Sequence, residues 1–146
     1  MNTGLRRGDL FGLTWGRVNI ERKQLTVTAG TAKSGKVRHV PLNQEALDVL
    51  KRWKKYHAGG EFVFPGARGR MTHINKSWAR LMQAAKLTDY RFHDCRHNFA
   101  SSLVMNGVDL YTVKDLLGHS DFAMTQRYAH LAPEHKAAAV EKLVAR

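Results

Sequence analysis

Residues 17–43 read RVNIERKQLTVTAGTAKSGKVRHVPLN, and this stretch decides the fold class. It contains three runs with the side-chain composition of β-strands, at 17–20, 24–28 and 37–42. Polar turn-forming residues separate these runs, at 21–23 in the first gap and at 33–36 in the second. Three consecutive strands with short connections predict a small antiparallel sheet near the start of the chain.

Helical patterns lie on both sides of the predicted sheet. A short helix is expected over 5–13, and Asn43 is suited to cap a helix that follows the last strand. A loop is expected around 58–71, and further helices are expected over 73–86, 92–105, 109–117, 121–129 and 134–144. The residues suited to begin or end these helices are Asp109, Gly118, Asp121 and Pro133. The predicted class is α+β, mainly α-helical, with one small three-stranded antiparallel sheet.

Charge points to a polyanionic partner. The 146 residues, a length that suits one domain, include 24 Lys and Arg against 12 Asp and Glu, for a net charge of +12. Such an excess favours double-stranded DNA, although a basic protein without a polyanionic partner and an anionic membrane surface are alternatives. No amphipathic interfacial helix, spanning segment or signal sequence is apparent, and Cys95 is the only cysteine. The expectation is a cytoplasmic protein that does not bind membranes.

Residues 91–97 read RFHDCRH and contain the first chemically informative group. On a helix, His93, Arg96 and His97 project from one face because they are three and four residues apart. The apolar neighbours of Arg96 make an isolated guanidinium costly, so an anion should meet it. A phosphate suits the planar fork of arginine, and a structural carboxylate is the alternative.

The same segment raises the question of a metal site. His93 and His97 have the spacing of zinc-binding histidines on a helix, and Cys95 lies between them. The metalloprotease pattern places Glu directly after the first histidine, whereas this chain has Asp94, and Arg96 would oppose a cation. A metal is therefore disfavoured.

Two downstream residues complete the candidate set. Residues 117–120 read LGHS, a pattern typical of a tight turn that places His119 at a helix terminus. Tyr128 follows nine residues later. Either residue alone has an ordinary explanation, a solvated turn for the histidine and a core position for the tyrosine.

Taken together, these motifs resemble the catalytic domain of the tyrosine recombinase (phage integrase) family over nearly the whole chain. Residues 3–10, TGLRRGDL, are similar to the family's first arginine motif, with Arg6 in the catalytic place. Lys33, in the turn before Val40-Pro41-Leu42, is similar to the family's β-hairpin lysine. The positions that match the H-x-x-R box, the following histidine and the nucleophile are His93, Arg96, His119 and Tyr128.

The resemblance implies a DNA strand transferase that forms a 3′-phosphotyrosyl intermediate through Tyr128. Arg6, Arg96 and His119 would contact the phosphate, and Lys33 would protonate the leaving 5′-oxygen. His93 would accept the tyrosine proton, with His97 and Asp9 in supporting roles, Asp9 holding Arg6 and the neighbouring backbone. Neither a cofactor nor a metal is expected, because the covalent intermediate conserves the phosphodiester bond energy.

The chain departs from the family pattern in three places. Asp9 stands where Glu is more usual, Cys95 where Leu is usual, and the chain begins just before the first motif. Residues 1–146 are therefore expected to form a single catalytic domain truncated at its N-terminus, without the N-terminal core-binding domain. The resemblance also implies a tetramer on DNA and accessory DNA-bending or directionality proteins. The segment around 137–144 would pack on a neighbouring subunit or, as the alternative, on the core of its own chain.

Three other functions remain open from the sequence. A type IB topoisomerase uses similar chemistry without exchanging partners. A catalytically inactive or incomplete fragment would keep the basic surface as a DNA-binding module. A plain helical interaction protein would show no salt-dependent DNA binding.

Overall fold

A three-stranded antiparallel sheet follows the first short helix, as predicted. The computed structural model describes residues 2–28, 37–57, 59–67, 69–133, 140–141 and 143. The strands β1 (Val18–Asn19), β2 (Gln24–Val27) and β3 (Arg38–Pro41) lie in the order β1-β2-β3. Each ends within two residues of its predicted bounds. The predicted turn at 21–23 joins β1 to β2, and the second predicted turn, at 33–36, lies outside the described residues.

The first core forms where the sheet meets helix α2 (Gln44–Tyr56). Asn43 caps this helix, since its side-chain oxygen accepts a hydrogen bond from the backbone N–H of Ala46 at 3.0 Å. Leu25 and Val40 face each other in register on β2 and β3. These two residues pack in one cluster with Leu47 of α2, which is buried. Helix α1 (Arg7–Phe11) and the 3₁₀ turn η1 (Trp15–Arg17) precede the sheet.

The predicted loop around 58–71 contains a small hairpin. The strands β4 (Pro65–Gly66) and β5 (Gly69–Arg70) pair antiparallel. Two-residue strands of Pro, Gly and Arg carry no hydrophobic alternation, so nothing in the sequence pattern indicated them. Just before the hairpin, the fully buried Val63 donates its backbone N–H to the Leu13 carbonyl oxygen at 2.8 Å, which ties this segment to the first core.

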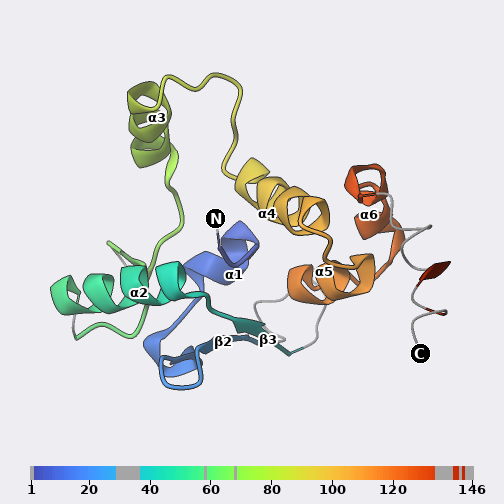
Figure 1. The fold of residues 1–146 in the computed structure, drawn as a ribbon. Helices are drawn as coiled ribbons and strands as arrows, with labels where there is room; N and C mark the ends of the chain where they lie inside the picture. Colours follow the sequence, from blue (N-terminus) through green and yellow to red (C-terminus); the bar gives the residue numbers. More distant parts are fainter. Residues whose placement is uncertain are drawn as a thin grey trace.

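A second core lies among the C-terminal helices. It contains α4 (Asp94–Met105), α5 (Leu110–Leu117), α6 (Ala123–Gln126) and the 3₁₀ turn η2 (Ala129–Leu131). The buried residues of this cluster are Ala100, Val104, Val113, Leu117 and Tyr128. Figure 1 shows α1 between α2 on one side and the helices α4 and α5 on the other. The sheet and α2 thus form one half of the molecule, and the C-terminal helices form the other.

The predicted helix ends agree with the structure for α5 and differ for α6. Asp109 caps α5 by accepting from the backbone N–H of Thr112 at 2.9 Å, and Gly118 ends it in the left-handed conformation. The helix predicted over 121–129 is instead the four-residue α6 followed by η2. Asp121 accepts from the Ala123 N–H at 2.9 Å ahead of α6. Most of the helix predicted over 134–144 lies outside the described residues, which include only 140–141 and 143 of it. The subunit contact expected there involves the same segment.

Helix α3 (Asn75–Ala84) stands away from the rest of the molecule, and none of its residues is buried (Figure 1). Trp78 connects it to the body. The indole N–H donates to the Tyr90 carbonyl oxygen at 3.1 Å, and the indole ring meets the Phe92 ring edge-on at 5.2 Å. The aromatic side chains of this connection line an apolar cavity of about 450 Å³ between α3, α1 and α4.

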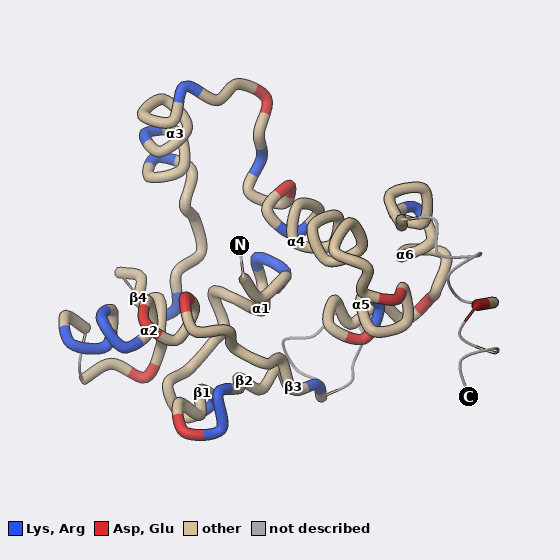
Figure 2. The backbone as a smooth tube through the Cα atoms, viewed as in Figure 1, with Lys and Arg blue, Asp and Glu red and all other residues tan. Residues whose placement is uncertain are grey.

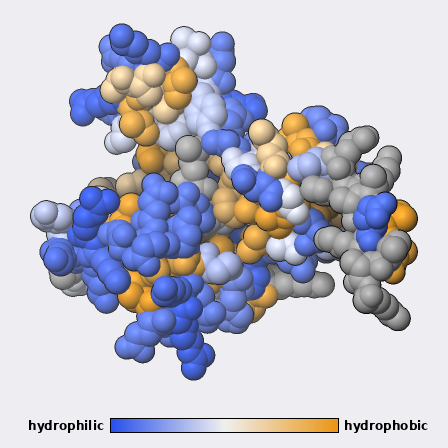
Figure 3. Space-filling model, in the orientation of Figure 1, coloured by the Kyte–Doolittle hydropathy of each residue, from blue (hydrophilic) through white to orange (hydrophobic). Residues whose placement is uncertain are grey.

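Lys and Arg residues are distributed along much of the described backbone (Figure 2). The four lysines and arginines of the second half of α2 lie together, and α3 carries two basic residues and no carboxylate. In the space-filling view, hydrophilic residues cover most of the face over α2 and the β1–β2 turn (Figure 3). No helix among the described residues has both the length and the apolarity needed to cross a membrane.

Candidate active site

One cavity gathers the residues that the sequence analysis singled out. It has a volume of about 140 Å³ and lies where α1 meets the C-terminal helices. Its lining residues are Arg6, His93, Arg96, His97, His119, Met124, Arg127 and Tyr128. Six of these eight are predicted site residues, and they come from segments up to 122 positions apart. Lys33, the predicted general acid, lies outside the described residues.

Arg96 is the most deeply buried of the cavity's cations, with 5% of its surface exposed. It lies on the first turn of α4, and its guanidinium donates to the backbone carbonyl oxygens of Gly4 and of Leu117, the latter at 2.7 Å. These two bonds use two of its five N–H donors. The sequence left open a phosphate or a structural carboxylate as the partner of Arg96. In the structure, two backbone carbonyl oxygens are its hydrogen-bond acceptors.

The charge on Arg96 persists at neutral pH despite this burial. Desolvation, followed by the positive charges of Arg6 and Arg38, lowers the pKa of Arg96 to about 10. A group with a pKa of about 10 is still protonated at pH 7. Arg96 therefore presents a positive charge in a poorly solvated site, where an anion is attracted more strongly than in water.

Arg6 reaches the same cavity from the N-terminal end of α1. One terminal nitrogen donates to the Gly118 carbonyl oxygen at 3.1 Å, and the other is buried with no hydrogen-bond partner among the described residues. Burial lowers the pKa of Arg6, while Asp9 acts against that effect. An unpartnered guanidinium nitrogen beside a cavity is a donor available to an incoming anion.

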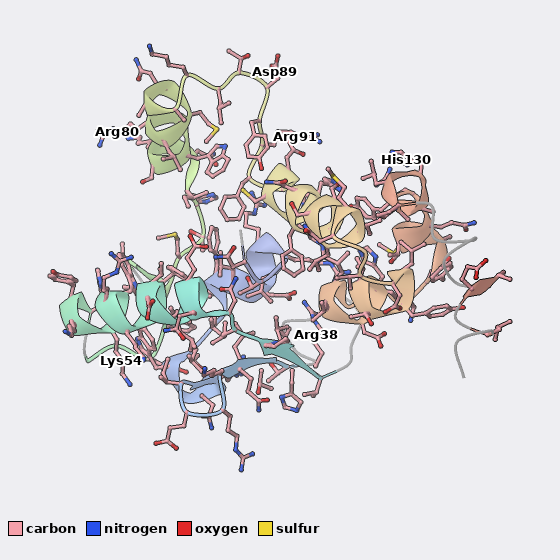
Figure 4. All side chains as sticks on the ribbon, viewed as in Figure 1. Arg38, Lys54, Arg80, Asp89, Arg91 and His130 are labelled. Carbon is pink, nitrogen blue, oxygen red and sulfur yellow. The ribbon has the colours of Figure 1, made fainter. Side chains whose placement is uncertain are left out.

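Asp9 holds a different arginine from the one expected. Its carboxylate is 1% exposed and forms an ion pair with Arg38 of β3, with 2.9 Å between Oδ2 and the guanidinium nitrogen. The charge of Asp9 also raises the pKa of Arg6. Figure 4 shows Arg38 between the sheet and α5, and two of its nitrogens are buried without partners among the described residues.

The sequence analysis missed Met124 and Arg127, which line the cavity, and Arg38, which lies beside it and pairs with Asp9. Arg38 lies two positions before Val40, whose side chain is buried, so alternation along β3 places Arg38 on the inner face of the sheet. That alternation was the available signal. A charged residue on the inner face of a strand requires a partner, and only the tertiary structure identifies it as Asp9.

His119 follows directly after the left-handed Gly118. Its Nδ1 lies 2.7 Å from the hydroxyl of Thr125, which is fully buried. Desolvation, followed by the positive charges of Arg96, Arg6 and Arg38, lowers the pKa of His119 to about 4. His119 is therefore neutral at pH 7 in the unliganded protein. The negative charge of a phosphate in the cavity would favour its protonated form.

Tyr128 lies between α6 and η2 and is 6% exposed. Its hydroxyl is 2.5 Å from Nδ1 of His97, one of the two supporting residues expected from the sequence. Burial raises the pKa of Tyr128, and the charges of Arg127 and Arg96 act in the opposite direction. Within the described residues, no hydrogen bond joins Tyr128 to His93, the histidine expected to accept its proton.

The described residues contain no group of three or more His, Cys, Asp or Glu side chains arranged to hold a metal ion. The His93 and His97 rings meet edge-on with 5.0 Å between their centroids, and Arg96 lies between them in sequence. The cavity is lined by cations, a hydroxyl and imidazoles. This set suits a phosphate diester better than it suits a cation.

The chain is similar to known integrases and tyrosine recombinases. The integrase of Salmonella phage P22 is 33% identical over 147 residues, covering 92% of this chain and 38% of that protein. Tyrosine recombinase XerD of Pseudomonas aeruginosa is 36% identical over 140 residues, covering 88% of this chain and 46% of that protein. The Tn1549 transposon integrase, solved in complex with circular intermediate DNA, matches with a TM-score of 0.79 at 25% identity, covering 98% of this chain and 56% of that one.

The chain thus spans less than half the length of these two curated relatives. The solved structure shares the mainly helical fold with a small antiparallel sheet. The family model described as the phage integrase family matches residues 1–135, which include all six residues expected to be catalytic. The chain belongs to the phage integrase family.

Proposed function

We propose that this chain is the catalytic part of a tyrosine-type site-specific recombinase, which cleaves and rejoins double-stranded DNA. One observation carries the proposal: a single cavity gathers three guanidinium groups, three imidazoles and the side chain of Tyr128. A phosphodiester in that cavity would meet Arg6 and Arg96 at its non-bridging oxygens, where negative charge develops during attack. His119 would add a hydrogen bond to the same phosphate.

The proposed reaction exchanges one phosphodiester for another. The Tyr128 oxygen forms a bond to phosphorus as its proton leaves, and the bond from phosphorus to the 5′-oxygen breaks. The 5′-oxygen takes a proton from a general acid, the role that the family resemblance gives to Lys33. The product is a 3′-phosphotyrosyl link and a free 5′-hydroxyl, and the reverse reaction with another 5′-hydroxyl completes the strand exchange. Because bond energy is conserved, no ATP is consumed.

Charge supports double-stranded DNA as the partner. The net charge is +12, and a relative of known structure was solved with circular intermediate DNA. Recombination joins strands from two duplexes, so several copies must act together, and we infer a homo-oligomer on DNA, a tetramer by family resemblance. Accessory DNA-bending or directionality proteins fit the same scheme.

The experiment that tests this proposal captures the covalent intermediate. The chain is incubated with a pool of nicked duplexes, randomised around the nick, from which the short 5′-hydroxyl fragment diffuses away after cleavage. A protein–DNA band that resists denaturation is expected for the parent chain and for Tyr111→Phe, whose tyrosine is 68% exposed on α5. The band should be lost for Tyr128→Phe.

The remaining outcomes distinguish the alternatives. DNA binding without any adduct from the parent chain would favour a DNA-binding module and count against the proposal. An adduct accompanied by relaxation of supercoiled plasmid, with no exchange between two duplexes, would favour a topoisomerase. An adduct that persists in Tyr128→Phe would identify a different nucleophile.

A further inference from the structure

His97 is one helical turn beyond His93 on α4, and it is the histidine that reaches the Tyr128 hydroxyl. The distance between Nδ1 and the phenol oxygen is 2.5 Å, at the short end of the range for hydrogen bonds to a hydroxyl. The ring of His97 also packs against Tyr128, with 6.1 Å between centroids, and against the edge of His93 at 5.0 Å. His97 therefore contacts both His93 and the nucleophile.

From this geometry we propose that His97, rather than His93, is the catalytic residue that accepts the Tyr128 proton during strand cleavage. The inference rests on the proposed function, because it names the proton acceptor of that reaction. It also assigns the opposite role in the second half of the reaction, since the acceptor of a proton in one direction must donate it in the other.

The surroundings of His97 keep it able to accept a proton. Burial, followed by the charge of Arg127, lowers the pKa of His97, so the ring is neutral at pH 7. In the tautomer with hydrogen on Nε2, Nδ1 carries no proton and can accept one. The charged and titratable groups around it are Arg91, His93, Asp94, Arg96, His119, Arg127 and Tyr128. Asp94 is the carboxylate of this set, and it favours the protonated ring.

Tyr128 needs such an acceptor. Burial raises its pKa above the ordinary value near 10, so at neutral pH almost none of it is ionised. In the proposed step, the proton moves from the Tyr128 oxygen to Nδ1 of His97 as the oxygen–phosphorus bond forms and the bond to the 5′-oxygen breaks. The resulting imidazolium would be disfavoured beside Arg127 and Arg96, but the bound phosphate brings the compensating negative charge. During rejoining, the Tyr128 oxygen leaves phosphorus and recovers this proton.

The first test needs no DNA. Nitrogen-15 NMR of the labelled chain follows each histidine through a pH titration. For a Tyr128–His97 bond in solution, Tyr128→Phe should shift the His97 Nδ1 resonance and its titration midpoint and leave His130, an exposed histidine labelled in Figure 4, unchanged. An unchanged His97 titration in Tyr128→Phe would overturn the inference, whatever the outcome of the DNA capture experiment.

The second test measures single-turnover cleavage of a nicked duplex captured by the parent chain, across a range of pH. His97→Asn keeps an oxygen near the position of Nδ1, which can accept a hydrogen bond but cannot take up a proton. The expected result is a 10²- to 10⁴-fold slower cleavage with DNA affinity unchanged, the range typical of a lost general base. The parent rate should fall as the pH drops through the lowered pKa of His97, below the ordinary histidine value, because protonated His97 cannot accept, and His97→Asn should lack this fall.

The controls separate a chemical role from a structural one. His130→Asn should cleave at the parent rate, and His93→Asn should keep the parent's pH dependence. Added imidazole should partly restore cleavage in His97→Gly. Loss of the pH dependence in His93→Asn instead of His97→Asn would make His93 the acceptor. Faster cleavage in His97→Asn would show that the bond restrains the nucleophile, and either result would overturn the inference.

Discussion

Asp9 and Arg38 show how single residues hold the cationic site together. Arg6, Arg38 and Arg96 each lower the pKa of His119, so their positive charges converge on one region. Asp9 is the one carboxylate among the causes of the pKa shifts of both Arg6 and Arg96, and its Oδ2 pairs with Arg38. The negative charge of Asp9 therefore offsets part of the repulsion among Arg6, Arg38 and Arg96. A bound phosphate would offset the rest.

Asp9→Ala should destabilise the protein by about 3–5 kcal/mol, because it leaves the Arg38 guanidinium buried and unpaired. Urea unfolding followed by tryptophan fluorescence measures the free energy of unfolding. The control is Asp115→Ala, which breaks the pair with Lys114 and removes a carboxylate that is 82% exposed. Solvent screens that pair, so its loss should be much smaller. Equal losses in the two variants would contradict the prediction.

At the scale of elements, the end of α5 positions part of the candidate active site. Gly118 has φ of +63° and ψ of 48°, and its carbonyl oxygen accepts from Arg6. A Cβ at this position would lie 2.7 Å from a terminal nitrogen of Arg38. The glycine is thus required by the backbone conformation and by the close approach of Arg38, and the turn it makes places His119 in the cavity.

Gly118→Ala should lower the free energy of unfolding by at least about 1–2 kcal/mol, the cost of the left-handed conformation for a residue with a Cβ. The clash with Arg38 adds to this cost and should also displace His119. Gly8→Ala in α1 is the matched control, since a Cβ there meets no atom within 4 Å. Alanine should be neutral or slightly stabilising at that position. Chemical denaturation of both variants checks the prediction, and a neutral Gly118→Ala would refute it.

For the whole molecule, charge and shape are the relevant features. The two cores lie in different halves, and the candidate active site is formed between them. Helix α3 stands apart with Lys76 and Arg80 and no carboxylate (Figure 2). A projecting basic helix, tied to the body through Trp78, would add surface for contact with the phosphate backbone of a duplex under the proposed function.

Binding to duplex DNA should weaken steeply with salt, with a logarithmic slope of about −0.9 for each phosphate contacted. If Lys76 and Arg80 each bind a phosphate, Lys76→Gln/Arg80→Gln should make the slope shallower by about 0.9 for each of these phosphates. Fluorescence anisotropy at several salt concentrations measures these slopes. Tyr128→Phe removes no charge and should keep the parent slope. Identical slopes for the parent and the double variant would exclude α3 from the DNA interface.

The order of the main elements and most of the residues that line the candidate site could be predicted from the sequence, because both depend on local patterns. Alternating and helical spacing predicted β2, β3 and α5 to within two residues, and Asn43 and Asp109 cap helices as expected. The short hairpin β4–β5 and the division of the helix predicted over 121–129 into α6 and η2 were not foreseen, since such short elements have no periodicity.

Partnerships between distant residues were decided only by tertiary structure. The sequence indicated that Asp9, His93, His97 and Tyr128 belong to one site, but Asp9 pairs with Arg38, and His97 reaches the tyrosine. His93 and His97 share a helix face, so spacing alone cannot distinguish them. Which of the two meets Tyr128 depends on how α4 packs against the segment after α6, a contact between residues 31 positions apart that no local pattern encodes.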